Sequence, residues 1–275
     1  MVIAGELATR ARAGKDSRVS DTDGPDIDML QHELAEESGS YGFDLVTHTT
    51  VAAYHRVLGL SGDGDAFRLP DYPSHRTLTP NPDGSRPSRV VFLIGNTRAA
   101  WPHFMATLDA QPARRSDPHP FDRWTSEVIT RVVVAVVGPH YGFDVRFVFE
   151  GGVRAFSALH LAEATGLAYR GPAGLAVNPL LGPWFALRAA ITIDINGIEA
   201  PTPDPVCRRC VGQPCVAALN RAMADKSTSE VDHGVLRERW RDWLAVRDAC
   251  PEGTSLRYSD AQIRWHYGHD RGALE

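Results

Sequence analysis

The sequence contains no run of apolar residues long enough to cross a membrane, which takes about 18 to 20 of them. Its first residues also lack the charged head and apolar core of a secretion signal. Basic residues are not in surplus, because the formal net charge is -5 at pH 7 and the pI is about 6.1. The attraction to phosphate that drives nucleic-acid binding is therefore weak. We expect a cytoplasmic protein with neither a membrane nor a nucleic-acid partner.

Several catalytic signatures are also missing. The sequence has no Gly-x-Gly-x-x-Gly turn, no P-loop and no nucleophile elbow for a Ser-His-Asp triad. Its glycine-rich stretch at Gly59 to Gly64 lies in a polar segment. These absences argue against a nucleotide-phosphate site and against serine hydrolase chemistry.

Cysteine is scarce, and all of it lies late in the chain. The four cysteines are Cys207, Cys210, Cys215 and Cys250, and the first three of them have Cys-x2-Cys-x4-Cys spacing. A secreted fold held by disulfides would spread more cysteines through a shorter chain. The grouping therefore indicates a metal site, a redox site or the remnant of one.

Helix and strand patterns alternate through the middle of the chain. The apolar run Val90 to Gly95 predicts a buried strand, and the alternating stretch Phe143 to Phe149 predicts a half-buried one. Helical patterns span residues 99–108 and 121–130, and an apolar run at 132–137 ends at Gly138-Pro139. This interleaving favours a layered α/β or α+β domain over a helical bundle.

Composition suggests how the chain is divided. With 43% hydrophobic and 23% charged residues, it is typical of a globular protein with one main domain. Polar, low-hydrophobicity segments mark residues 1–26 as a flexible leader and 71–88 as a loop. We expect a core at 27–200, a cysteine-containing insert at 201–231 and a C-terminal helical segment at 232–275 that completes the site.

The segment after the second half-buried strand contains a helix, an apolar loop and a strand. Apolar spacing predicts an amphipathic helix over residues 153–167, and repeated Gly and Pro make 171–184 an apolar loop of the kind that lines a cavity. Alternation then predicts a strand over 185–195, with Arg188 on its small-residue face beside Ala186, Ala190 and Thr192. Arg188 could bind an anionic ligand there or lie on a solvated sheet face.

A second arginine is placed unusually near the C-terminus. In the helical pattern at 237–247, Arg247 falls on the same stripe as Trp240, Trp243 and Leu244. A buried guanidinium needs a carboxylate or an anionic ligand, because an unpaired buried charge costs several kcal/mol. The alternative is an Arg side chain that covers the two indoles and reaches solvent.

Three blocks in the same order resemble the cblC-type family of cobalamin-processing proteins. They are Gly174-Leu-Ala-Val-Asn-Pro-Leu-Leu-Gly-Pro-Trp-Phe-Ala-Leu-Arg188, Arg239-Trp-Arg-Asp-Trp-Leu-Ala-Val-Arg-Asp-Ala-Cys250 and Tyr258-Ser-Asp-Ala-Gln262. The resemblance implies a flavin-nitroreductase-like α+β domain with a mixed or antiparallel central sheet flanked by helices. It also implies reductive decyanation of cobalamin, or alkyl transfer from cobalt to a thiol such as glutathione, with FMN or FAD as a further candidate cofactor.

The resemblance also implies roles for particular residues. Arg188 and Arg247 match arginines that hold the thiol. The cobalamin contacts that it implies are His160, Gly174, Leu175, Ala176, Val177, Asn178, Pro179, Trp184, Tyr258 and Gln262. For His160, a hydrogen-bonded core histidine is the alternative.

The cobalt ligand of other cobalamin enzymes is missing. Their Asp-x-His-x-x-Gly signature is absent, since Asp117-Pro-His119 is not followed by the glycine. We therefore expect base-off cobalamin without a protein ligand on cobalt.

The cysteines resemble the ferredoxin-like insert of bacterial relatives, which also end in an Ala-Cys-Pro-x-Gly block, here Ala249 to Gly253. In those relatives Cys-Pro follows the third cysteine, whereas this chain has Leu219-Asn220. Three alternatives stay open: a [4Fe-4S] cluster completed by Cys250, a zinc site of the four thiolates with His266 or His269 as substitutes, and no metal.

Two other functions stay open beside the enzyme. One is a chaperone that binds cobalamin without turnover, and the other is an iron-sulfur or flavin redox protein of the same fold. A homodimer and a downstream cobalamin acceptor are further expectations.

Overall fold

The computed structural model describes residues 26–59, 67–71, 87–200, 206–224 and 239–275. Residues 1–25 of the expected leader and most of the polar stretch 71–88 lie outside these ranges, as do residues 201–205 and 225–231 of the expected insert. Within the described ranges, no helix combines the length and the apolar character that crossing a membrane requires.

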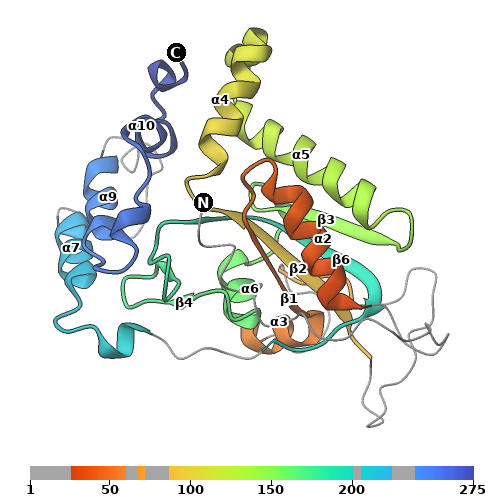
Figure 1. Cartoon of the computed structure of the whole chain (residues 1–275). Coiled ribbons are helices and arrows are strands. Elements are labelled where there is room, and N and C mark those ends of the chain that lie inside the picture. The colour runs from red at the N-terminus through yellow and green to blue at the C-terminus, as the bar shows by residue number, and fades with distance from the viewer. Residues whose placement is uncertain (1–25, 60–66, 72–86, 201–205, 225–238) are drawn as a thin grey trace, which may run out of the picture.

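A four-stranded antiparallel sheet forms the centre of the molecule (Figure 1). Its strands lie in the order β1 (Leu45–Thr50), β2 (Arg89–Asn96), β6 (Ala186–Asn196) and β3 (Phe143–Phe147). The strands expected at 90–95, 143–149 and 185–195 are β2, β3 and β6. The expected α+β class, with an antiparallel sheet flanked by helices, is confirmed.

Helices cover both faces of this sheet. One face carries α2 (Ile27–Gly39), α4 (Ala100–Ala110) and α5 (Pro120–Val136). The other carries α3 (Val51–Leu58) and α6 (Ala158–Ala164). Strand β2 is buried along its whole length, since Phe92 and Ile94 pack in the first layer and Val91 and Leu93 in the second. A strand enclosed on both sides explains the unbroken apolar run in the sequence.

The apolar run at 132–137 lies at the end of a helix. Helix α5 continues from Pro120 through Val136, although β-branched residues disfavour helices slightly. Val132 and Val133 are buried one turn beyond Val128 and Ile129, on the stripe that faces the sheet. Packing of that stripe outweighs the local preference.

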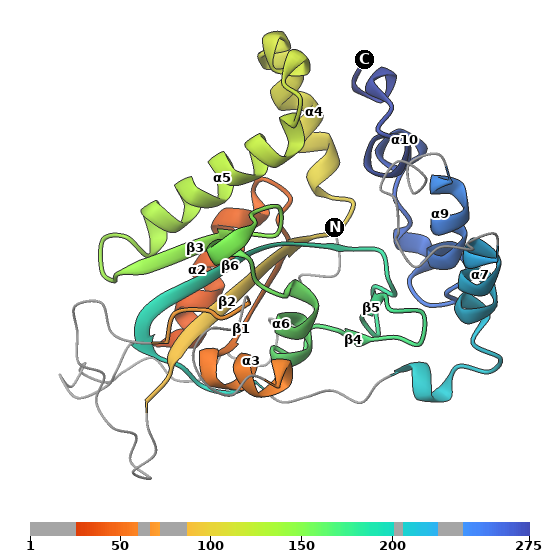
Figure 2. The same cartoon turned by 180° about the vertical axis from the view of Figure 1, so that it is seen from behind.

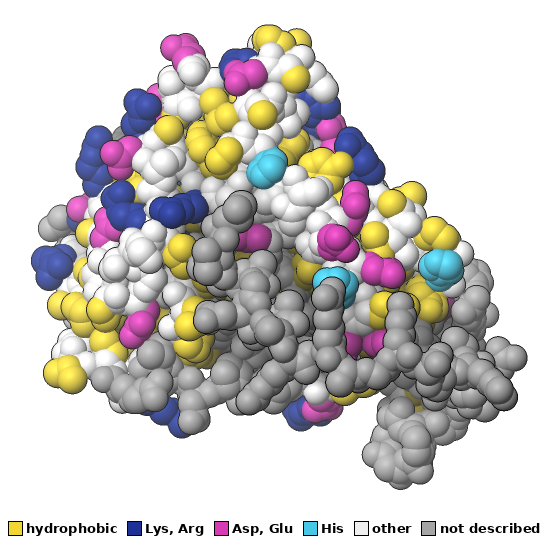
Figure 3. Space-filling model, in the orientation of Figure 1, with side chains coloured by type: hydrophobic (Ala, Val, Ile, Leu, Met, Phe, Trp, Pro, Cys, Tyr) yellow, Lys and Arg dark blue, Asp and Glu magenta, His cyan; other side chains and the backbone are white. Residues whose placement is uncertain are grey.

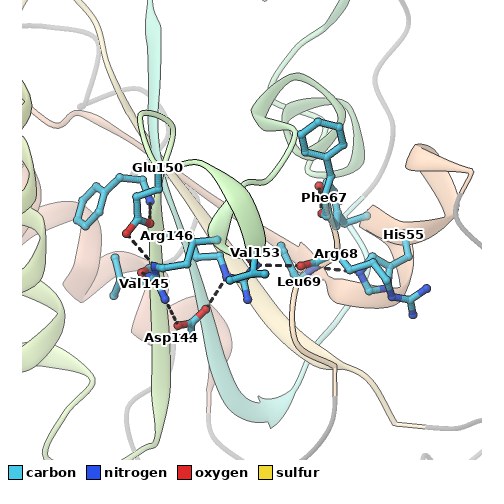
Figure 4. A network of polar contacts seen from close by, with 12 residues as sticks. His55, Phe67, Arg68, Leu69, Asp144, Val145, Arg146, Glu150 and Val153 are labelled. Atoms are coloured by element: carbon cyan, nitrogen blue, oxygen red, sulfur yellow. Dashed lines mark hydrogen bonds and ion pairs between the residues drawn. The ribbon is translucent and has the colours of Figure 1, made fainter. Parts of the chain in front are cut away.

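The helix predicted over 153–167 is largely wrong. Helix α6 spans only Ala158–Ala164, residues Gly152–Arg154 form the short helix η2, and Val153 is 92% exposed. Arg154 is held by Glu150 and Asp144, and Arg146 donates to the carbonyl oxygen of Val153 at 3.1 Å (Figure 4). These polar contacts hold the segment beside strand β3 and prevent it from joining the helix.

The same polar network ties the edge strand to a distant segment. Arg146 on β3 donates to Asp144 at 2.8 Å and to the carbonyl oxygen of Arg68 at 2.9 Å. The backbone amide of Leu69 donates to Nε2 of His55 at 3.2 Å. On the edge strand itself, the carbonyl oxygen of Val145 accepts from Arg154 and the amide of Phe147 donates to Glu150 at 2.8 Å, so fewer backbone groups are free for another chain.

The remaining elements lie beyond one end of the sheet. Strands β4 (Tyr169–Arg170) and β5 (Ala176–Val177) form a short hairpin between the sheet and helices α7 (Pro214–Met223) and α9 (Trp240–Asp248) (Figure 2). Helix α7 packs on α9. The other elements at this end are η3 (Val206–Arg209), η4 (Thr254–Leu256), α10 (Asp260–Gly268) and η5 (Arg271–Leu274), whereas η1 (Pro112–Ser116) connects α4 to α5.

Charge is unevenly distributed over the face seen in Figure 3. Arg side chains gather on the side of α7 and α9, and Asp and Glu side chains gather over α2. Apolar side chains are scattered among them, which is usual for a soluble surface.

Candidate functional site

A β-bulge sets the direction of Arg188. In the pairing of β2 with β6, Ile94 lies opposite Ala189 and Gly95 opposite Leu187, so Arg188 is the extra residue. Its guanidinium carbon lies 4.8 Å from the centre of the Phe121 ring, in the layer of α5. The face predicted for Arg188 was therefore wrong. Alternation placed Arg188 on the same face as Ala190, but Ala190 packs with Leu187 in the opposite layer. The bulge turns Arg188 away from the small residues with which simple alternation groups it.

Asn96 holds Arg188 in place, and the sequence analysis missed it. Asn96 is fully buried, and its Oδ1 accepts from Nε of Arg188 at 2.6 Å. Its Nδ2 donates to the carbonyl oxygen of Thr97 at 2.6 Å, and Asp44 accepts from both the amide and the hydroxyl of Thr97. The available signal was a pair of polar residues directly after a buried strand.

Arg247 approaches from helix α9. Its guanidinium carbon lies 5.7 Å from the ring centres of both Trp184 and Tyr267. The predicted stripe divides, because Leu244 and Trp240 pack around Trp184 whereas Trp243 packs towards α7. Arg247 thus lies at the end of the apolar loop, next to Trp184.

Four side chains near these arginines contain buried polar atoms that lack a hydrogen-bond partner. These atoms are Nε of Arg247, the hydroxyl of Tyr258, both amide atoms of Gln262 and Nε2 of His266. Gln262 and His266 are four residues apart on α10, so they share one face of that helix. We call Arg188, Arg247, Tyr258, Gln262 and His266 the buried polar cluster.

Leaving these atoms unpartnered is costly, at about 1–3 kcal/mol for each buried group. Natural proteins rarely leave buried polar groups unsatisfied without a functional reason. The arrangement of the cluster therefore suits a polar ligand that carries acceptors for the guanidinium groups.

Positive charge dominates the cluster. Burial lowers the pKa of Arg188, although a guanidinium remains charged in proteins. Burial, followed by the charges of Arg188 and Arg247, lowers the pKa of His266 well below its usual value. Burial raises the pKa of Tyr258, which keeps its hydroxyl protonated. The carboxylate of Asp122 interacts electrostatically with Arg188, but no described carboxylate forms an ion pair within 4.0 Å of either arginine, so an anionic ligand would be favoured.

A second site lies behind the Gly/Pro-rich loop. All four cysteines line one cavity of about 20 Å³, together with Leu175, Val177 and Gly171 of the hairpin. We call it the cysteine cavity. This loop was expected to line a cavity, and the cavity that it lines carries the thiols of the four cysteines, not the two arginines. At the end of the loop, the ring of Trp184 lies against the guanidinium group of Arg247.

A close backbone approach brings Cys250 to this cavity. A Cβ atom on Gly182 would lie 2.0 Å from the carbonyl oxygen of Glu252, and one on Gly253 would lie 2.0 Å from that of Leu181. Both glycines also have positive φ, of 58° and 67°. Glycine at both positions lets the loop and the Cys250 segment pack backbone to backbone.

The cysteine cavity has the donor chemistry for a soft metal. Its volume exceeds the roughly 10–15 Å³ that one water-sized species needs, and thiolates suit zinc or iron-sulfur clusters. Burial and the neighbouring thiols raise the pKa of Cys215, and burial raises the pKa of Cys250. No three described His, Cys, Asp or Glu side chains are spaced as ligands of a single ion. His266 and His269 line a different cavity, so they are not substitutes for these thiols.

The other residues expected to contact cobalamin are spread along the hairpin and loop. Both nitrogens of His160 have partners, Ser157 at 2.6 Å and Arg170 at 2.7 Å. Asn178 holds the loop itself, because its Oδ1 accepts from the amides of Leu180 and Leu181. Gly174 turns the hairpin at a φ of 74°, Ala176 and Val177 form β5, and Leu175 and Pro179 are half-buried.

The backbone as a whole resembles that of a solved structure. The C. elegans B12-trafficking protein CblC, described as a human MMACHC homologue, aligns with a TM-score of 0.61 at 14% identity, over 90% of this chain and 95% of that one. The chain has the fold of CblC. This confirms the expected cblC-type, nitroreductase-like architecture at the level of fold.

Two other solved structures align with this chain at lower TM-scores. An epoxyqueuosine reductase from Streptococcus thermophilus aligns with a TM-score of 0.47 at 10% identity, over 88% of this chain and 78% of that one. A selenomethionine-labelled epoxyqueuosine reductase reaches 0.44 at 14% identity, over 70% and 52%. No protein-family model and no curated protein sequence matches the chain.

Proposed function

We propose that this protein binds base-off cobalamin and removes its upper axial ligand, by reductive decyanation or by alkyl transfer to a thiol. The observation that carries the proposal is the buried polar cluster, in which two guanidinium groups and three other side chains with unpartnered polar atoms gather within the CblC fold. The C. elegans protein is described as trafficking B12.

The chemistry of the cluster supports a thiol that carries carboxylates, such as glutathione. Guanidinium groups bind carboxylates through paired, charge-assisted hydrogen bonds. Arg188 and Arg247 come from different elements, β6 and α9, so two carboxylates of one ligand could each meet an arginine. Holding the thiol in this way would orient its sulfur towards the cobalt-bound carbon, which can contribute several kcal/mol to the rate.

We also propose that the residues implied by the sequence resemblance contact the corrin ring. The exposed backbone of the loop around Gly174, together with Ala176 and Pro179, could pack on an uncharged macrocycle. His160 would meet it through its ring rather than through a nitrogen, because both nitrogens are engaged. Tyr258 and Gln262 lie in the buried polar cluster, so their polar atoms could contact either the corrin amides or the thiol.

A visible spectrum tests the proposal directly. Purified protein is mixed anaerobically with methylcobalamin and glutathione, or with cyanocobalamin and a reduced flavin, and the cobalamin absorption is followed over time. We expect protein-dependent loss of the upper-ligand bands. Absorption of the protein before any addition also reveals a bound flavin.

The same measurement separates the chaperone. Tight binding of cobalamin with an immediate spectral shift and no later conversion would support a carrier that delivers cobalamin to an acceptor. A protein that leaves the cobalamin spectrum unchanged would contradict both functions.

We propose in addition that the cysteine cavity binds a thiophilic metal ion through Cys207, Cys210, Cys215 and Cys250. All four thiols line it, but no three described side chains are spaced as ligands of one ion, so binding would have to draw the thiols together. The small volume of the cavity favours one zinc ion over a [4Fe-4S] cluster. The test is metal analysis of the anaerobically purified protein and of two variants, Cys250→Ser and Cys207→Ser, each of which removes one thiol. Zinc near one equivalent, lost in both variants, is expected. Iron with sulfide and a brown colour would favour the redox alternative, and metal-free protein would contradict the site.

A further inference from the structure

His266 occupies a particular place in the buried polar cluster. Its ring centre lies 5.0 Å from that of Phe121, 6.0 Å from that of Trp101 and 6.0 Å from that of Tyr258. Aromatic rings from α5, from α4 and from the segment before α10 therefore hold the imidazole in place. Its Nε2 is buried and has no hydrogen-bond partner. A fixed imidazole with a free buried nitrogen is arranged to exchange a hydrogen bond or a proton with a ligand.

The imidazole also reaches a second space. A cavity of about 320 Å³ is lined by His266 together with His119, Asp122, His269 and Arg271. This space is large enough for several water molecules. His266 thus lies between the buried arginines and a polar cavity whose walls carry other titratable groups.

The charges around His266 keep it neutral in the free protein. Arg188 from β6, Arg247 from α9 and His269 from its own helix all lower its pKa, in addition to burial. On the cavity side, it faces Asp122 and His119 of the α5 end and Arg271 of η5. The imidazole therefore carries no proton on its free nitrogen at neutral pH, and the carboxylates of a bound thiol would offset the arginine charges that oppose its protonation.

The other members of the cluster cannot accept a proton at neutral pH. Arg188 and Arg247 remain protonated, and Gln262 has no basic atom. Tyr258 is already protonated, since burial raises the pKa of its hydroxyl. Within the buried polar cluster, His266 is therefore the one member suited to act as a base.

We propose that His266 is the general base that removes the proton from the thiol cosubstrate. This rests on the proposed function. The S–H proton passes to Nε2 of His266, and the sulfur lone pair forms a bond to the cobalt-bound alkyl carbon. The Co–C bond breaks with both electrons remaining on cobalt, which is reduced from Co(III) to Co(I) as the thiol becomes a thioether. The proton then leaves His266 for the cavity lined by His119 and Asp122, and the two guanidinium groups stabilise the thiolate.

Replacing the base tests this inference. His266→Gln keeps a hydrogen-bonding side chain but removes the basic nitrogen, and His103→Gln on the exposed surface of α4 is the matched control. With methylcobalamin and glutathione at pH 7, we expect kcat to fall about 100-fold in His266→Gln, the typical range for a lost general base. The KM for glutathione should change little, and His103→Gln should match the unaltered protein.

The pH profile distinguishes a base from a structural residue. A free thiol ionises near pH 8.5–9, so the deficit of His266→Gln should shrink to a few-fold by about pH 9. Added imidazole should restore part of the rate of His266→Ala at pH 7. A deficit that stays constant from pH 6.5 to 9, without imidazole rescue, would overturn the inference. If the unaltered protein does not turn over alkylcobalamin with a thiol, the proposed function fails instead.

Discussion

Single residues in this protein depend on neighbours that no sequence pattern links to them. Arg188 is directed by a bulge in β6 and anchored by Asn96 at the end of β2. Its position was predictable as unusual, but its direction was not, because simple alternation placed it on the opposite face. A bulge adds one residue to one strand only, and the period-two pattern cannot reveal it.

Arg247 offers the simplest test of ligand binding at this scale. Arg247→Ala removes one charge-assisted contact of about 1.5–3 kcal/mol, so thiol-dependent dealkylation at subsaturating glutathione should fall about tenfold or more. Arg241→Ala, an exposed arginine of the same helix that lies over Trp240, is the control and should have little effect. Unchanged kinetics for Arg247→Ala would remove Arg247 from the mechanism.

Asn96 allows a sharper test, in which the guanidinium is kept and its charge is neutralised. In Asn96→Asp, a carboxylate would pair with Arg188 in place of the amide oxygen now 2.6 Å from Nε. The internal pair competes with the carboxylate of the thiol, so KM for glutathione should rise about tenfold or more. The same change at an exposed position of α7, Asn220→Asp, should leave KM unchanged. A lower KM in Asn96→Asp would contradict an anion site at Arg188.

At the scale of elements, backbone contact between the apolar loop and the Cys250 segment organises the far end of the molecule. Gly182 and Gly253 face each other, and neither position has room for a Cβ atom. Helix α9 ends at Asp248, directly before this contact, and Cys250 follows it and lines the cysteine cavity. The spacing of the cysteines suggested a shared site, but only this approach brings the fourth one to the others.

Gly253→Ala should destabilise the protein strongly. Positive φ costs a non-glycine residue about 1–2 kcal/mol, and forcing extra atoms into a packed site adds about 1–3 kcal/mol. Gly59→Ala is the control, because Gly59 has a φ of 72° and no atom lies within 4 Å of the position of a Cβ. This variant should therefore show only the cost of the positive φ. Thermal unfolding measures both, and a Tm for Gly253→Ala equal to that of Gly59→Ala would show that the close approach relaxes at no cost.

Protonation links the buried site to the stability of the whole molecule. The pKa of His266 is lowered by burial and by the arginines, whereas in the unfolded chain it is about 6.5. Below that pH, His266 is protonated in the unfolded state but stays unprotonated in the folded state. The free energy of unfolding should therefore fall as pH drops below about 6.5, by up to about 1.4 kcal/mol per pH unit for this group.

Urea unfolding at pH 5.5 and pH 7.5 checks this dependence. His266→Gln should reduce the difference between the two pH values. His48, whose pKa is also lowered by burial, should leave a smaller dependence of the same sign. Asp122 acts with the opposite sign, because burial raises the pKa of its carboxyl, but its effect lies closer to the ordinary carboxyl range near about pH 4. An unchanged pH dependence in His266→Gln would contradict a neutral buried His266.

For the whole molecule, the sequence patterns predicted a layered α/β or α+β domain, and the family resemblance narrowed this to α+β. The patterns also located three of the four strands of the central sheet, β2, β3 and β6. Buried strands such as β2 and amphipathic helices such as α5 carry periodic apolar patterns, which depend only on local geometry. The division into leader, core, insert and C-terminal segment, the homodimer and the cobalamin acceptor stay predictions.

Only the tertiary structure decided which side chains share a site. It cut the helix expected at 153–167 to α6, because ion pairs with β3 hold the first residues elsewhere. It also brought His266 of α10 and Asn96 of β2 to Arg188, and Cys250 to the other three cysteines. These partners are far apart in the chain, and their meeting depends on a bulge, a glycine contact and helix packing, none of which leaves a periodic signal in the sequence.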